Sequence, residues 1–208
     1  MKTQVIRSAH PYEPYIPKGA TKLIIGTIPP HRFCDRSEEL CPGDVDFYYG
    51  SYLNRFWHLV SEVTGIRLAF ENTKAAVKQR KDLLKDLNMG IMDVVKICSR
   101  KEGKSKIAKA DDASLEVIET QPLEGLLSKY PDIDTLLYTS GSSNGVKGQV
   151  YRMLKAEHKL IDKENREYQI SVNGKEYKVI ILYSPSPRAK AYASKRQAQY
   201  ERVFGLND

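Results

Sequence analysis

The chain has 208 residues, and 33 Lys and Arg against 26 Asp and Glu give it a formal net charge of +7. The length suits one domain with an appendage, and hydrophobic and charged fractions of 41% and 28% exclude wholesale disorder. No apolar run reaches the roughly 18 residues of a membrane span, and the N-terminus lacks the apolar stretch of a secretory signal. We therefore expect a cytoplasmic protein that makes no membrane contact.

The cysteines and the charge pattern bear on which metal sites and which binding partners the protein can have. Cys34, Cys41 and Cys98 are too few for a four-cysteine zinc or iron–sulfur site and lack C-x-x-C spacing. Residues 74–109 hold eleven basic and four acidic side chains, whereas residues 111–134 hold seven acidic side chains and one Lys. The basic block is typical of a protein that binds a polyanion, and also of an ordinary solvated surface.

In chain order, the first twenty residues contain Pro11, Pro14 and Pro17 and predict an extended N-terminal arm. Residues 21–208 then form one domain. Apolar runs predict four core strands, and a turn at Asn173-Gly174 predicts an antiparallel strand over 167–172 before the last of them. The four core strands are expected at residues 21–26, 90–97, 133–139 and 177–183.

Helical periodicity fills most of the intervals between these strands. Ser114 or Asp112 is a candidate N-cap for the third predicted helix. Strands that alternate with helices indicate an α/β fold, in which a mostly parallel sheet is covered by helices on both faces. The helices are expected at residues 54–62, 74–87, 115–129, 146–160 and 191–204.

The loops that follow the core strands are the places to look for a site, because ligands of such sheets bind beyond the carboxyl ends of the strands. Three of these loops are rich in Gly, Ser or Pro, namely residues 26–30, 139–143 and 184–187. We call residues 26–30 the first loop and residues 184–187 the Ser-Pro loop. Such residues suit contacts with phosphate or sugar, and they also simply make turns.

Four segments together carry a family resemblance. They are Leu23-Ile-Ile-Gly-Thr-Ile-Pro-Pro30, Tyr48-Tyr-Gly-Ser-Tyr-Leu-Asn-Arg-Phe-Trp57, Gly90-Ile-Met-Asp-Val-Val95 with Cys98, Arg100 and Gly103, and Leu182-Tyr-Ser-Pro-Ser-Pro-Arg-Ala189. In order and spacing, from about Thr21 to Phe204, the chain resembles the uracil-DNA glycosylase superfamily. The closest branches are the hypoxanthine (deoxyinosine) and the mismatch-specific uracil DNA glycosylases.

This resemblance implies a three-layer α/β/α sandwich around a four-stranded, mainly parallel sheet. It implies a monomeric, monofunctional glycosylase that flips a deaminated base, hypoxanthine or uracil, out of DNA and hydrolyses its N-glycosidic bond without a lyase step. No cofactor, metal or iron–sulfur cluster is expected. Two other functions stay open. One is a weak or inactive superfamily member that binds nucleic acid or a nucleobase, and the other is an unrelated doubly wound enzyme for small phosphorylated molecules.

The resemblance also assigns roles to residues at the base. Tyr49 stacks on the flipped base, Gly26 belongs to the base-binding residues, and the backbone N–H groups of Thr27 and Ile28 stabilise the leaving base anion. Asn54 orients the attacking water, and Ser140 contacts the base edge. Ordinary packing for Tyr49 and a helix N-cap for Asn54 are the alternatives.

The remaining predicted site residues are expected to bind the DNA. Arg188 corresponds to a residue that the family wedges into the duplex, and the Ser-Pro loop contacts phosphates. Three positions depart from the family pattern, since Ile28 and Ser140 replace asparagines and Tyr183-Ser184 replaces a catalytic His. The predicted DNA-binding residues are Ser184, Ser186, Arg188 and Lys190, with Lys195 and Arg196 either extending the track or lying on a solvated helix face.

Overall fold

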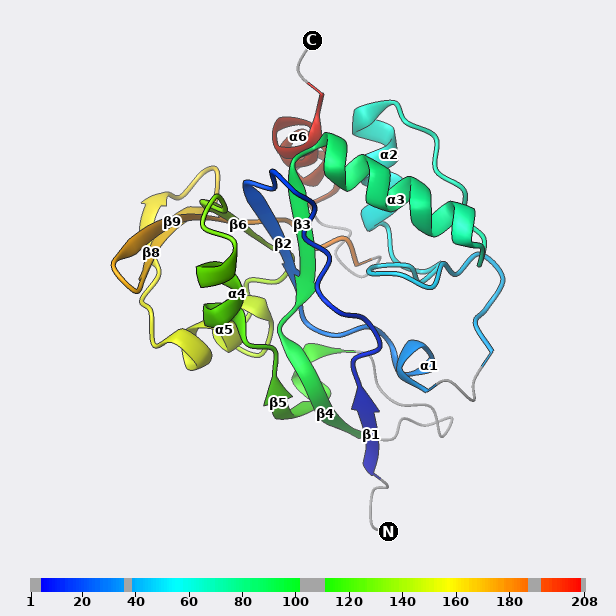
Figure 1. Ribbon diagram of the computed structural model, residues 1–208, viewed down its shortest axis with the longest axis horizontal. Coiled ribbons are helices and arrows are strands. Elements are labelled where there is room, and N and C mark those ends of the chain that lie inside the picture. Colours follow the sequence, from blue (N-terminus) through cyan, green and yellow to red (C-terminus); the bar gives the residue numbers. More distant parts are fainter. Residues whose placement is uncertain (1–4, 36–38, 102–110, 187–191, 207–208) are drawn as a thin grey trace.

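The computed structural model describes residues 5–35, 39–101, 111–186 and 192–206. These residues form two β-sheets, which we call the large sheet and the small sheet (Figure 1). The large sheet has six strands in the order β3 (Met89–Asp93), β2 (Lys22–Gly26), β6 (Thr135–Tyr138), β9 (Lys175–Ile181), β8 (Glu167–Val172) and β7 (Lys159–Asp162). The small sheet has three strands in the order β1 (Val5–Ala9), β4 (Val95–Lys101) and β5 (Leu115–Thr120).

Four strands of the large sheet, β3, β2, β6 and β9, pair in parallel. A parallel strand lies at each of the four predicted core positions, although the one predicted over 90–97 ends at Asp93. The predicted count of four strands is wrong, because β8 and β7 extend the sheet by antiparallel pairing. The turn between β8 and β9 has positive φ at Asn173 (53°) and at Gly174 (78°), which is the backbone of the expected hairpin turn.

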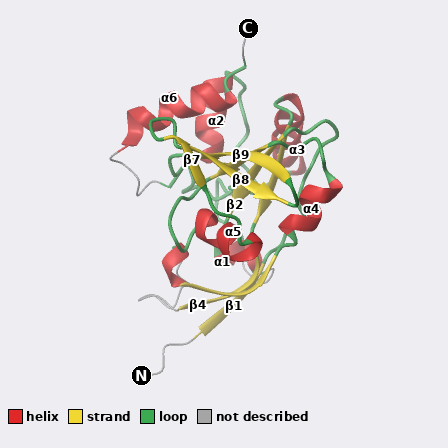
Figure 2. Cartoon of the chain, turned by 90° about the vertical axis from the view of Figure 1, so that its left-hand side faces the viewer, coloured by secondary structure: helices red, strands yellow, loops and turns green. Residues whose placement is uncertain are grey.

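Both faces of the large sheet are buried along its parallel strands, as the continuous apolar runs predict, whereas the edge strand β7 is exposed. In β2, Ile24 faces a core shared with helices α2 (Phe56–Thr64), α3 (Lys74–Asp86) and α6 (Ala193–Phe204). Leu23 and Ile25 point the other way, into a core shared with α4 (Leu123–Lys129) and α5 (Val146–Leu154). The result is three layers, with helices on either side of the sheet (Figures 1 and 2).

The small sheet was not predicted from the sequence. Only Val94 separates β3 from β4, so the single predicted strand over 90–97 is two strands that belong to different sheets. The small sheet therefore follows the carboxyl end of β3, and Figure 2 shows it beyond that edge of the large sheet. Strand β1 of the N-terminal arm pairs antiparallel with β4, and Tyr15 of the arm bridges Ile91 of β3.

Two helix predictions need correction. Residues 115–129 are not one helix, because Leu115–Thr120 is strand β5 and a helix begins only after Pro122. Residues 146–160 are also not one helix, because α5 ends at Leu154, where Lys155 takes a left-handed φ of 51°. The short helix α1 (His31–Cys34) and the 3₁₀ turn η1 (Asp112–Ser114) complete the described elements.

Candidate active site at the carboxyl edge of the large sheet

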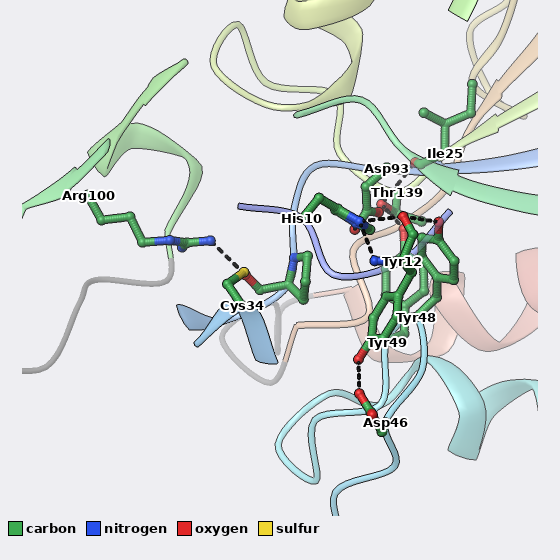
Figure 3. A network of polar contacts seen from close by, with 11 residues as sticks. His10, Tyr12, Ile25, Cys34, Asp46, Tyr48, Tyr49, Asp93, Arg100 and Thr139 are labelled. Carbon is green, nitrogen blue, oxygen red and sulfur yellow. Dashed lines mark hydrogen bonds and ion pairs between the residues drawn. The ribbon is translucent and has the colours of Figure 1, made fainter. Parts of the chain in front are cut away.

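Tyr49 lies where the carboxyl ends of three parallel strands meet (Figure 3). Its hydroxyl is 2.9 Å from Oγ1 of Thr139, the residue that follows β6. Its ring stacks on Phe56 of α2, with centroids 4.5 Å apart. Burial, and secondarily the charge of Asp93, holds the pKa of Tyr49 well above its ordinary value, so its hydroxyl stays neutral. The ring is thus fixed at both ends, between the sheet and a helix.

Gly26, at the end of β2, makes room for this arrangement. A Cβ at this position would lie 2.1 Å from Oδ1 of Asp93 and 2.3 Å from the hydroxyl oxygen of Tyr49. Both distances are far inside van der Waals contact, so no other residue fits without displacing one of these side chains. The glycine that the sequence assigns to base binding therefore has a packing role as well.

Asp93, the last residue of β3, pairs with a histidine from the N-terminal arm. His10 Nε2 lies 2.9 Å from Oδ2 of Asp93, and the His10 side chain is fully buried. At the other side of the ring, Nδ1 lies 2.9 Å from the Tyr12 carbonyl oxygen and 3.1 Å from the Tyr12 backbone nitrogen, so both ring nitrogens have polar partners. Sequence reasoning missed this pair, which joins residues 83 positions apart.

Asp112 of η1 connects two of the predicted site residues. Its carboxylate is hydrogen-bonded to the side chains of Thr27 in the first loop and Ser140 after β6. Burial, followed by the charges of Asp93 and Asp111, raises the pKa of Asp112, and the two hydroxyl hydrogen bonds oppose that shift. The sequence suggested Asp112 only as a helix cap, because its partners lie on distant loops.

The first loop is held in place from the small sheet. Arg100 of β4 is buried, and its Nη2 donates to the Pro29 carbonyl at 2.6 Å while its Nε donates to Ser8 Oγ at 3.0 Å. Beside it, burial raises the pKa of the Cys34 thiol to about 12, which keeps this thiol protonated (Figure 3). The Ile28 side chain packs against the core on the α4 and α5 side of the sheet.

Asn54 lies just before α2, where its side chain caps the helix. The N-cap residue of α2 is Arg55, which makes no side-chain capping bond, and Asn54 Oδ1 instead accepts the backbone N–H of Phe56, the first helical residue, at 2.8 Å. Its amide nitrogen has no hydrogen-bond partner among the described residues. The next residue, Arg55, donates its backbone N–H to the Pro185 carbonyl at 3.2 Å, so Asn54 lies next to the Ser-Pro loop.

The Ser-Pro loop is described through Ser186. Ser184 Oγ accepts the Ser186 N–H at 3.2 Å, which closes a small turn, and Gln199 of α6 accepts the Tyr183 N–H. Arg196 is only 5% exposed and donates to the Ser184 carbonyl at 3.1 Å, so it supports the loop and does not extend a solvated DNA track. Two further predicted DNA-binding residues, Arg188 and Lys190, lie outside the described residues.

The predicted site residues therefore form two groups. Gly26, Thr27 and Ser140 gather around Asp112, Asp93 and the Tyr49 hydroxyl, whereas Asn54 and Ser184 flank the Arg55 contact with the Ser-Pro loop. The stack of Tyr49 on Phe56 bridges the two groups. Within the described ranges, no three His, Cys, Asp or Glu side chains gather as a metal site requires, and no helix is long and apolar enough to cross a membrane.

Comparison with solved structures finds a similar fold. A solution NMR structure described as that of "a putative Uracil DNA glycosylase" from Methanosarcina acetivorans superposes with a TM-score of 0.58. The match covers 96% of this chain and 97% of the other at 18% identity. No protein-family model and no curated protein sequence matches the chain. The chain thus has a mixed α/β fold like that of this neighbour, which by itself leaves the function open.

Proposed function

We propose that this protein is a monofunctional DNA glycosylase that hydrolyses the N-glycosidic bond of a deaminated base, hypoxanthine or uracil, as a cytoplasmic monomer. The observation that carries the proposal is the cluster around Tyr49, in which an aromatic ring, two carboxyl groups and the first loop meet at one edge of the sheet. That edge is where parallel α/β sheets bind their ligands. The motifs that resemble the glycosylase superfamily fall on this cluster and on the adjoining Ser-Pro loop.

In the proposed reaction, the flipped base stacks on the ring of Tyr49, and Ser140 contacts the base edge. Bond breakage leaves positive charge on the sugar and negative charge on the base. The backbone N–H groups of Thr27 and Ile28, in the loop that begins at Gly26, stabilise the base anion. Asn54 orients the attacking water through its amide nitrogen. In the family resemblance no lysine of this sequence aligns with a Schiff-base nucleophile, which supports a reaction that stops at the abasic site.

We assign binding of the DNA backbone to the Ser-Pro loop and the residues that follow it. Ser184 and Ser186 contact the phosphates that flank the flipped nucleotide, and Arg188 fills the gap in the duplex with Lys190 beside it. These contacts are made with the charged phosphate backbone and not with particular bases. We therefore expect DNA binding to weaken as the salt concentration rises.

The test is a panel of duplexes that carry a single uracil, hypoxanthine or xanthine, incubated with the protein and then with alkali to cut abasic sites. We expect cleavage of at least one of the deaminated substrates. The absence of cleavage on every substrate overturns the enzymatic proposal. If salt-sensitive binding to DNA persists in that case, the alternative of an inactive nucleic-acid binder is favoured, which agrees with the core-facing Ile28 side chain.

The role of Asn54 needs a substitution that separates catalysis from capping. Asn54→Ala removes both functions, whereas Asn54→Ser keeps an oxygen that accepts the Phe56 N–H and removes the amide nitrogen. We expect both variants to lose cleavage at least tenfold, and only Asn54→Ala to lose about 1 kcal/mol of stability. An Asn54→Ser variant that cleaves at the wild-type rate would show that Asn54 is only a cap.

A further inference from the structure

A group that accepts a proton from the attacking water accelerates hydrolysis of a glycosidic bond, and the residues assigned so far do not supply one. The Oδ1 of Asn54 accepts the Phe56 N–H, and a neutral amide can orient a water molecule but is too weak a base to take its proton. The side chain of Ile28 is apolar and packs into the core. The acceptor must therefore come from elsewhere at this edge of the sheet.

Two carboxyl groups lie there, and they differ in access. Asp93 has a side chain only 7% exposed, and His10, itself fully buried, covers its Oδ2. Asp112 is only half-buried, and its carboxylate contacts both the first loop at Thr27 and the loop after β6 at Ser140. These are the two loops that the proposed function places against the leaving base. Of the two carboxylates, Asp112 is the one that a water molecule beside the substrate reaches.

The surroundings of Asp112 also suit a base. Two hydroxyl donors, from Thr27 and Ser140, orient the carboxylate from two different loops. A Cβ on Gly145, the residue before α5, would lie 2.8 Å from its Oδ2, so the glycine lets the carboxylate approach that helix end. Burial and the charges of Asp93 and Asp111 raise the pKa of Asp112, which makes it a stronger proton acceptor than an exposed aspartate.

We propose that Asp112 is the general base of this site, an assignment that rests on the proposed glycosylase function. The ionised carboxylate takes a proton from the water as the water oxygen forms its bond to C1′ of the sugar. The N-glycosidic bond breaks, and its electron pair leaves with the base, which takes a proton from solvent while Asp112 returns its proton to solvent. The Thr27 and Ser140 hydroxyls hold the carboxylate toward the reacting water.

This assignment predicts an acidic limb in the pH dependence of cleavage. The reaction requires the ionised carboxylate, so the rate falls as pH falls through the raised pKa of Asp112. The charged groups that act on Asp112 are Asp93 of β3 and the neighbouring Asp111, and both oppose its ionisation. The contacting side chains of Thr27 and Ser140 do not titrate in this range.

The experiment compares Asp112→Asn with the matched control Asp111→Asn, which removes the neighbouring charge and leaves the Asp112 carboxylate in place. Asp112→Asn keeps the shape of the side chain and removes a charge that burial disfavours, so we expect it to fold. Single-turnover cleavage of the most reactive duplex is measured between pH 4 and 9, with thermal unfolding and DNA binding in parallel. We expect Asp112→Asn to lose about 10²- to 10⁴-fold in rate and its acidic limb, with binding retained. Asp111→Asn should stay within about threefold of wild type.

The outcomes separate this assignment from the proposed function. If the wild-type protein cleaves and Asp112→Asn keeps the rate and the acidic limb, the general-base assignment is overturned and the glycosylase proposal stands. If the wild-type protein cleaves nothing, both fall. If Asp112→Asn does not fold, Asp112→Glu is used in its place, because it keeps the carboxylate. Partial activity in Asp112→Glu with its acidic limb supports the assignment, and a profile without that limb contradicts it.

Discussion

The two sheets of this protein differ in how they contribute to the candidate site. The large sheet supplies mainly backbone and small side chains, because β2 ends at Gly26 and β6 is followed by Thr139 and Ser140, and it adds Asp93 at the end of β3. The small sheet and the segments beside it supply the other charged side chains. Arg100 comes from β4, and Asp112 lies in the turn before β5. The site therefore forms at the junction of the two sheets.

This division has a physical basis. Parallel strands buried on both faces are apolar along their length, so a charge finds room only where such a strand ends, as Asp93 does in β3. A small sheet beyond that edge brings further charged groups within reach without burying them in the main core. We therefore expect substitutions on the small-sheet side to disrupt the polar contacts around Asp93 and Asp112. Substitutions in the large sheet should instead destabilise the protein through packing.

The largest effect is expected for His10→Ala, on the small-sheet side. Removal of the imidazole leaves the Asp93 carboxyl buried without its partner at 2.9 Å. We expect the free energy of unfolding to fall by about 2–3 kcal/mol, the usual cost when a charged group loses a buried hydrogen bond. Urea denaturation monitored by fluorescence measures the change.

A double-mutant cycle separates this pair from general packing. His10→Ala and Asp93→Asn should be strongly non-additive, since either change alone disrupts the same contact. His58→Ala serves as the matched control, because His58 is exposed and stacks on Phe70 at 3.8 Å with no buried partner. Equal losses for His10→Ala and His58→Ala would mean that the arm does not stabilise the site.

The large sheet was predictable and the small sheet was not, for reasons visible in particular residues. The run Leu23-Ile-Ile25 reads as a buried strand because it is apolar without alternation. By contrast, Leu115–Thr120 alternates between half-buried and exposed positions, but its apolar residues also fit a helical period that continues into α4. Pro122 is the signal that separates the two elements, since it favours a break before the helix.

The site was predictable in part for a similar reason. Gly26 and Thr27 lie at the end of β2, where the parallel-sheet rule directs attention, whereas Tyr49 was predicted from the family resemblance. The contacts of His10 with Asp93 and of Asp112 with Ser140 join residues far apart in the chain. Nothing local in the sequence indicates such pairing, because it depends on how the two sheets pack.

A smaller effect is expected for Gly26→Ala, which tests the large-sheet side. The new methyl group would overlap Oδ1 of Asp93 and the Tyr49 hydroxyl, and forced repacking of this kind costs about 1–3 kcal/mol. Gly125→Ala is the matched control, because a Cβ on this α4 glycine meets nothing within 4 Å and alanine favours a helix. Thermal unfolding of both variants gives the comparison, and equal stability would contradict the packing role of Gly26.

The smallest effect is expected for Tyr49→Phe, which lies between the two groups of site residues. The change removes the hydroxyl contact with Thr139 but keeps the ring on Phe56, so we expect a loss of about 1 kcal/mol in stability. If the ring stacks on the base, cleavage should change less than about threefold in Tyr49→Phe. Tyr49→Ala should lose about 5- to 150-fold, the equivalent of 1–3 kcal/mol of stacking. Equal loss in both variants would instead assign the role of Tyr49 to its hydroxyl, and the base would then have to stack elsewhere.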